Sequence, residues 1–176
     1  LDTARAHPSP ITFFDSIIHM APVILLRGSQ TALDYYESLL TEMQDRVREG
    51  IGAVPDERLR VYWEGMPIWP KVSELSEKFF DLYTVVAAST YCNYWAFEEY
   101  DGGDPLTWMA RVGTEIFINR DENTKQAFLR EMFERFDIDG AIFHNARTCP
   151  NNTNCRFGMP QRIRKEFDFP VLVIDG

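Results

Sequence analysis

Residues 139–155 read Asp-Gly-Ala-Ile-Phe-His-Asn-Ala-Arg-Thr-Cys-Pro-Asn-Asn-Thr-Asn-Cys. The stretch starts as a short apolar strand at residues 141–143 and then changes abruptly to polar and thiol side chains. In an open α/β sheet, ligands bind outside the carboxyl ends of the strands, because the loops diverge there and leave a crevice. A thiol in this position, before a proline and among small amides, therefore favours a functional cysteine over one that only packs in the core.

Strands and helices are expected to alternate on both sides of this stretch. The expected strands are residues 59–63, 84–88, 141–143 and 171–174, and the expected helices are 72–82, 104–117, 124–136 and 159–167. Strands separated by helices of about ten or more residues form βαβ units and a parallel sheet. We therefore predict an α/β fold with an open, parallel, four-stranded sheet and helices on both faces.

The part of the chain before the first strand is expected to be helical. Residues 1–28 contain three prolines and predict short helices joined by turns. Residues 31–49 carry apolar side chains at helical spacing, with Thr31 and Asp34 as an expected capping box and Gly50 just past the end. We predict a helical segment and linker at residues 1–56 and an α/β domain at residues 57–176.

Composition narrows the class of protein. Of 176 residues, 45% are apolar, which is typical of a globular chain. A net charge of −9 argues against a nucleic-acid groove, and no apolar run reaches the roughly 18 residues of a membrane span. Three cysteines, an odd number, favour a reducing cytoplasm over a disulfide scaffold. Because the chain lacks an initial Met and stops just past an apolar strand, we expect it to be a piece of a longer polypeptide.

The carboxyl ends of the four strands should meet at one edge of the sheet. This rim would gather Glu64, Gly65, Thr90, Tyr91, Cys92, residues 144–149 and Asp175. Two of the three cysteines thus fall within a few residues of a strand end, and the third lies in the same loop as Cys149.

The three thiols allow several interpretations. Cys92 taken alone is more simply a small buried apolar residue, whereas the polar surroundings of Cys149 favour a functional thiol. Cys149 and Cys155 are six positions apart, which matches neither a standard zinc spacing nor the C-x-x-C of thiol redox proteins. A site built from all three thiols stays possible.

Each of the other rim residues could have either a structural or a functional role. His144 is equally consistent with a general acid or base and with a polar residue that closes a strand end. Glu64 fits a loop better than catalysis, and Gly65 would let the backbone approach a neighbour or a ligand closely. Arg147 could lower the pKa of the nearby thiol or hold an anion. The sequence contains neither of the nucleotide-binding motifs G-x-G-x-x-G and G-x-x-x-x-G-K-[ST], and it lacks the G-x-S-x-G motif of hydrolases.

Several motifs, taken in order, carry a resemblance to a known family. They are Arg58-Leu-Arg-Val-Tyr-Trp-Glu-Gly-Met-Pro67, Thr90-Tyr-Cys92, Asp137-Ile-Asp-Gly-Ala-Ile-Phe-His144, Arg147-Thr-Cys-Pro-Asn-Asn152, Gly158-Met-Pro160 and Pro170-Val-Leu-Val-Ile-Asp175. Over residues 58–176 the chain resembles the benzoyl-CoA reductase / 2-hydroxyacyl-CoA dehydratase family. The loop from Thr148 to Asn152, followed by Gly158, looks closest to active-site subunits of ATP-dependent benzoyl-CoA reductases.

This resemblance implies a flavodoxin-like sheet and a four-iron four-sulfur cluster held by three cysteines. Cys149 occupies the place of one ligand, and Cys92 is kept as a second candidate. The family's other ligands usually come from a first domain that this chain lacks, so the chain alone is expected to be inactive. The other site residues expected on this basis are His144 and Glu64 for catalysis, and Gly65, Tyr91, Asn145 and Thr148 around the cofactor.

The resemblance also implies partners. The substrate would be an acyl-CoA thioester, and the subunit would pair with a homologous subunit. A separate ATP-hydrolysing iron–sulfur protein would supply low-potential electrons, with no nucleic acid or membrane involved. We expect reduction of an aromatic acyl-CoA; the alternatives are dehydration of a 2-hydroxyacyl-CoA and a non-catalytic docking module.

Overall fold

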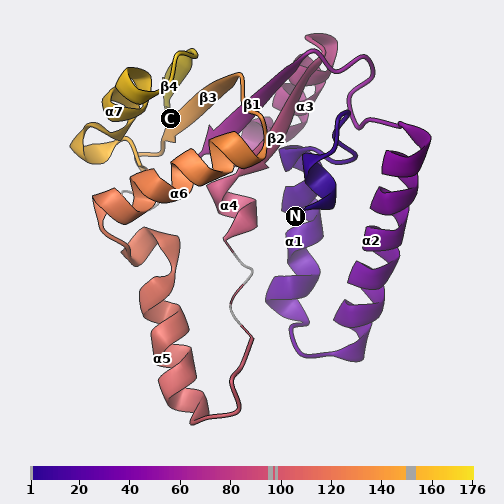
Figure 1. Ribbon diagram of the computed structural model, residues 1–176, viewed down its shortest axis with the longest axis vertical. Helices are drawn as coiled ribbons and strands as arrows, with labels where there is room; N and C mark the ends of the chain where they lie inside the picture. Colours follow the sequence, from indigo (N-terminus) through magenta and orange to yellow (C-terminus); the bar gives the residue numbers. More distant parts are fainter. Residues whose placement is uncertain (1, 95–96, 98, 150–153) are drawn as a thin grey trace.

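The computed structural model describes residues 2–94, 97, 99–149 and 154–176. Its centre is one sheet of four strands, β1 (Leu59–Glu64), β2 (Thr84–Ser89), β3 (Gly140–Asn145) and β4 (Val171–Asp175). All neighbouring strands pair in parallel, in the spatial order β2-β1-β3-β4 (Figure 1). The predicted α/β class and all four predicted strands are confirmed.

Helices flank this sheet and connect its strands. They are α1 (Phe13–Leu25), α2 (Gln30–Glu49), α3 (Val72–Asp81), α4 (Thr90–Asn93), α5 (Pro105–Glu115), α6 (Glu122–Arg135) and α7 (Met159–Glu166). Short 3-10 turns cover Thr3–Arg5, Trp69–Lys71, Phe117–Asn119 and Arg156–Gly158. Four of the α-helices, α3, α5, α6 and α7, correspond to the helices expected after the first strand.

The two faces of the sheet bury separate clusters because side chains alternate along each strand. On one face, Tyr62 and Phe143 pack against α6 and α7, with the Tyr62 ring edge-on to Phe133 at 5.1 Å. On the other face, Trp63 and Ile142 pack with α1 and α3, and the Trp63 ring stacks on an α1 phenylalanine at 5.5 Å. Helices therefore cover both faces, as predicted.

The strand order contains a reversal between β1 and β3. From β1 the chain moves outward to β2, and it then returns to the other side of β1 to build β3 and β4. This is the flavodoxin-like order, and its reversal is where such folds bind ligands, outside the carboxyl ends of the strands. The ends of β1 and β3, at Glu64 and Asn145, border this point.

The first 28 residues differ from the expectation of several short helices. A single helix of 13 residues, α1, begins at a capping box between Thr12 and Asp15 and contains Pro22. A helix-interior proline removes one backbone hydrogen bond and costs about 3 kcal/mol. Burial of the apolar face of α1, which includes Phe13 and Ile17, offsets that cost.

The long helix α2 has the predicted extent but a different start. Its N-cap is Ser29, whose hydroxyl accepts the Ala32 N–H at 3.2 Å, so the capping box expected at Thr31 and Asp34 is wrong. Gly50 ends the helix in the left-handed conformation, as predicted, at φ 67°. α1 and α2 stand side by side along one side of the molecule, at the right of Figure 1. The domain boundary at residue 56 stays a prediction.

None of the helices in the described part of the chain combines the length and the apolar character that crossing a membrane requires.

Candidate functional site

The carboxyl end of β1 carries a buried carboxyl group. Glu64 is 1% exposed, and its two oxygens accept hydrogen bonds from the Thr90 hydroxyl and from the Asn154 amide. The Tyr62 hydroxyl lies 2.6 Å from the Thr90 hydroxyl and extends the network. Burial raises the pKa of Glu64 to about 7, although both donors and the nearby Lys125 ammonium oppose the rise.

This network connects three segments that are distant in the sequence. Glu64 ends β1, Thr90 begins α4 after β2, and Asn154 lies in the segment between Cys149 and Cys155. A carboxyl with a pKa near 7 can hold or release a proton at neutral pH. Because Glu64 is 1% exposed, the main effect of its hydrogen bonds is to hold the cysteine-bearing segment against the centre of the sheet.

His144 points to the opposite face of the sheet from Glu64. Its ring lies 6.2 Å from the Trp63 ring, and its Nδ1 lies 2.6 Å from the Met66 carbonyl oxygen. A Cβ atom at Gly176 would come within 2.7 Å of His144 Nε2, so the chain after β4 also closes over the imidazole. These contacts favour the strand-closing role of His144 over acid–base chemistry, and they do not bring it together with Glu64.

Two of the three thiols lie in packed apolar surroundings. Cys92 packs in the cluster between the sheet and α1, where burial raises the pKa of its thiol to about 12. Cys155 packs against the cluster on the other face. All three thiols are half-buried, and Cys149 differs from the other two in that it belongs to neither cluster.

Tyr91 lies at the rim, within electrostatic reach of both Cys92 and Cys149. Burial raises the pKa of Tyr91, and the thiolate charges of Cys92 and Cys149 would raise it further. Its ring stands edge-on to Trp69, with 6.1 Å between centroids. The rim therefore brings Cys92, Tyr91 and Cys149 into one neighbourhood, as the order of the strands predicts.

The remaining predicted cofactor residues also lie at this edge. Gly65 is buried at φ 97°, a backbone conformation that favours glycine. The Asn145 amide donates to the Asp175 carboxylate at 2.6 Å, and Thr148 is exposed. The rest of that motif, residues 150–152, lies outside the described residues.

The thiols do not form a complete metal site. Within the described ranges, no three His, Cys, Asp or Glu side chains are arranged to hold a metal ion. Cys92 packs against an apolar cluster, where burial raises the pKa of its thiol to about 12, so a metal ion would have to displace the thiol proton to bind there. All three thiols are half-buried, Cys149 is the one that belongs to neither apolar cluster, and a four-iron cluster does not fit on these residues alone.

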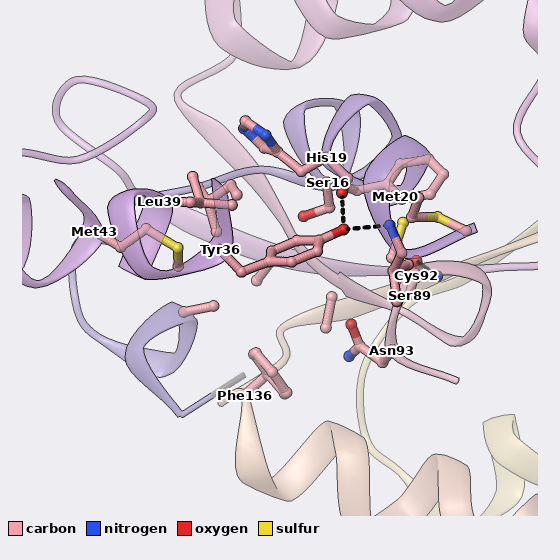
Figure 2. Close-up of a pocket in the computed structure, with 16 residues that line it drawn as sticks. Ser16, His19, Met20, Tyr36, Leu39, Met43, Ser89, Cys92, Asn93 and Phe136 are labelled. Carbon is pink, nitrogen blue, oxygen red and sulfur yellow. Dashed lines mark hydrogen bonds between the residues drawn. The ribbon is translucent and has the colours of Figure 1, made fainter. Parts of the chain in front are cut away.

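An apolar cavity, which the sequence did not reveal, lies beside the rim. It has a volume of about 390 Å³, lies between α1, α2 and the carboxyl end of β2, and is partly open to solvent (Figure 2). Its walls include Met20, Tyr36 and Cys92. Residues from three distant segments form it, so no local pattern could predict it. Asn154 was missed as well, because it is one of several similar amides in one loop.

Comparison with known proteins gives a family match over the whole chain. Residues 1–176 match the family model described as 2-hydroxyglutaryl-CoA dehydratase, D-component. The chain is 26% identical over 177 residues to the alpha subunit of the lactoyl-CoA dehydratase of Anaerotignum propionicum, covering 99% of this chain and 42% of that protein. It is 26% identical over 187 residues to a benzoyl-CoA reductase subunit of Thauera aromatica, covering 99% and 43%.

A third relative, the (R)-2-hydroxyisocaproyl-CoA dehydratase alpha subunit of Clostridioides difficile, is 27% identical over 176 residues, covering 98% of this chain and 42% of that protein. The chain thus spans less than half the length of the curated relatives that it matches. Both branches of the resemblance found in the motifs, reductase and dehydratase, occur among these relatives.

Proposed function

The chain belongs to the 2-hydroxyglutaryl-CoA dehydratase D-component family, and we propose that it forms one α/β part of an iron–sulfur subunit acting on an acyl-CoA thioester. The observation that carries this proposal is the position of Cys149. It follows the carboxyl end of β3, beside the strand-order reversal, and it is the one thiol outside the packed clusters. Cys92 and Cys155 are equally half-buried but pack against the two apolar clusters.

In this proposal Cys149 supplies one thiolate to a four-iron four-sulfur cluster. The other ligands come from outside these 176 residues, so the chain alone holds no stable cluster and is inactive. When bound, the cluster would provide single electrons at low potential, received from an ATP-hydrolysing iron–sulfur protein. The residues of this chain would orient it: Tyr91 lies near Cys149, and hydrogen bonds to cluster sulfurs tune the potential.

The reaction we propose is reduction of an aromatic acyl-CoA, because the motifs from Thr148 to Gly158 look closest to benzoyl-CoA reductase subunits. Dehydration of a 2-hydroxyacyl-CoA is the second candidate, because the Anaerotignum propionicum and Clostridioides difficile relatives are named as dehydratases. Each relative is named as a subunit of its enzyme, and a homologous partner subunit is part of the proposal for either reaction.

The proposal can be tested on the full-length subunit, produced anaerobically with its partner subunit. We expect a brown complex with broad visible absorbance, and ATP-dependent consumption of benzoyl-CoA when the electron donor is added. Consumption of an (R)-2-hydroxyacyl-CoA instead would favour the second candidate. A colourless complex that turns over neither thioester would contradict both the reductase and the dehydratase function, and it would favour a non-catalytic docking module.

A further inference from the structure

One buried carboxyl connects the two rim segments that carry Cys92 and Cys149. Glu64 Oε2 accepts a hydrogen bond from the Thr90 hydroxyl, which lies two residues before Cys92. Glu64 Oε1 accepts a hydrogen bond from the Asn154 amide, which lies five residues after Cys149. A single side chain at the end of β1 therefore bonds to both thiol-bearing segments.

The hydrogen bonds around Glu64 are shielded from water. Glu64 is 1% exposed, Thr90 is 4% exposed and Asn154 is 5% exposed. The backbone N–H of Gly65 also donates to the Glu64 carboxyl, and the Tyr62 hydroxyl lies 2.6 Å from the Thr90 hydroxyl. In a buried network of this kind, loss of one donor leaves a carboxyl oxygen without compensation from water. Separation of Asn154 from Glu64 is therefore unfavourable.

Cys149 is the thiol that apolar packing holds least. It belongs to neither apolar cluster, and its backbone N–H makes a long hydrogen bond, 3.4 Å, to the Ala146 carbonyl oxygen. Tyr91, which follows Thr90, packs against the cluster on the α1 side and lies within electrostatic reach of Cys149. The bond from Asn154 to the buried carboxyl can thus hold the segment after Cys149 in place beside Tyr91.

We infer that Glu64 is a positioning residue, which acts through Thr90 and Asn154 to hold Tyr91 and Cys149 next to each other at the rim. The consequence for an iron–sulfur cluster rests on the proposed function, in which Cys149 is a ligand. The hydrogen bonds themselves need no iron. Glu64 touches neither thiol and acts through its hydrogen-bond partners.

The rate of thiol labelling tests the position of Cys149. The full-length subunit, prepared without iron, reacts with N-ethylmaleimide, and mass spectrometry of each peptide gives the rate at each cysteine. Asn154→Leu keeps a similar side-chain volume but removes the donor to Glu64, so Cys149 should react at least about tenfold faster than in wild type. Cys92 packs against an apolar cluster and should keep its wild-type rate. A wild-type rate at Cys149, or an equal acceleration at Cys92 from general loosening, would overturn the inference.

A second buried glutamate provides the matched control. The Glu57 side chain is 6% exposed, accepts the Ser9 N–H at 2.7 Å and pairs with Arg60, at the opposite edge of the sheet from the rim. Glu57→Gln should lower the stability of the subunit and leave the labelling rate of Cys149 at the wild-type value. Equal acceleration of Cys149 in Glu57→Gln and Asn154→Leu would show an effect of stability alone and would overturn the inference.

Exchange of the two bonded groups tests the direct contact. Asn154→Asp brings two carboxyl groups together in a buried site, where like charges repel, so Cys149 should react faster at about pH 8.5. Addition of Glu64→Gln restores one amide and one carboxylate in reversed order. The double variant should return to within about twofold of the wild-type rate. A double variant that reacts as fast as Asn154→Asp alone would overturn the direct contact.

The cluster-loaded complex gives a second measurement. Asn154→Leu should shift the midpoint reduction potential of the cluster, because the placement of a ligand and its hydrogen bonds tune that potential, whereas Glu57→Gln should not. An unchanged potential in Asn154→Leu would overturn the positioning of a cluster ligand. A wild-type complex without iron would instead contradict the proposed function alone, because the labelling rates test the Glu64 hydrogen bonds without iron.

Discussion

At the scale of single residues, the structure separates side chains that the sequence groups together. Glu64 and His144 both lie at the rim, as the strand ends predict, but they face opposite sides of the sheet. Their separation depends on the register between β1 and β3, which pairs Glu64 with Phe143. The residue types at the rim could therefore be predicted, but their hydrogen-bond partners could not. The contact between Glu64 and Asn154 joins residues 90 positions apart.

The buried carboxyl of Glu64 predicts a specific pH dependence of stability. Its pKa is raised from 4.5 to about 7 in the folded chain. Between these values the unfolded chain is ionised at Glu64 while the folded chain stays neutral. The Glu64 carboxyl therefore makes its full contribution to the free energy of unfolding below pH 4.5. This contribution, up to about 3 kcal/mol, is lost as pH rises through 7.

Urea unfolding of wild type and Glu64→Gln between pH 4.5 and pH 7 measures this effect. Gln resembles the neutral carboxyl in shape and does not titrate, so the variant should gain stability relative to wild type as pH rises. Glu74→Gln is the control, because Glu74 is exposed and Lys71 lowers its pKa below this range. A constant difference between wild type and Glu64→Gln would show that Glu64 is already ionised in the folded chain.

Gly65 makes a second prediction about a single residue. Its φ of 97° is unfavourable for side chains, so Gly65→Ala should lower the free energy of unfolding by roughly 1–3 kcal/mol. Gly113 lies inside α5 with open space around its Cα, and Gly113→Ala should instead stabilise the chain by about 0.5–1 kcal/mol. Chemical denaturation of both variants checks the pair, and equal effects would refute the backbone argument.

At the scale of elements, strands were easier to predict than helix starts. Each strand is a short apolar run ended by polar residues, and the structure extends each predicted strand by one to three residues. The start of α2 was wrong because Ser29 and Thr31 are both capping residues by type. Only the extended backbone at Ser29, at φ −97° and ψ 152°, decides between them. α1 was missed because Pro22 read as a break, although buried contacts hold the helix across it.

The cap of α2 can be tested directly. Ser29→Ala removes the acceptor for the Ala32 N–H and should destabilise the chain by about 1 kcal/mol. Thr31→Ala is the control and should have an effect below about 0.5 kcal/mol, because Thr31 is exposed inside the helix. The two unfolding midpoints in urea give the comparison. A larger loss for Thr31→Ala would restore the capping box that we expected from the sequence.

At the scale of the whole molecule, the sheet is complete enough to define a rim but supplies one suitable ligand thiol. Cys92 and Cys155 pack against the two apolar clusters, and Cys149 belongs to neither, so Cys149 is the thiol we prefer as a ligand. The chain spans 42% of the length of its lactoyl-CoA dehydratase relative. The family and the sheet followed from motifs and apolar runs, whereas the number of available ligands depended on tertiary burial and could not be predicted from spacing.

The most direct test of this account is the iron content of the full-length complex, purified anaerobically with Cys149→Ala or Cys155→Ala. If Cys149 supplies a cluster thiolate, as we propose, that variant should lose most of its iron and its acyl-CoA turnover. Cys155→Ala should keep both near wild-type levels, because Cys155 is a packing residue. Undiminished iron and turnover in Cys149→Ala would contradict the ligand assignment and the iron–sulfur function that rests on it.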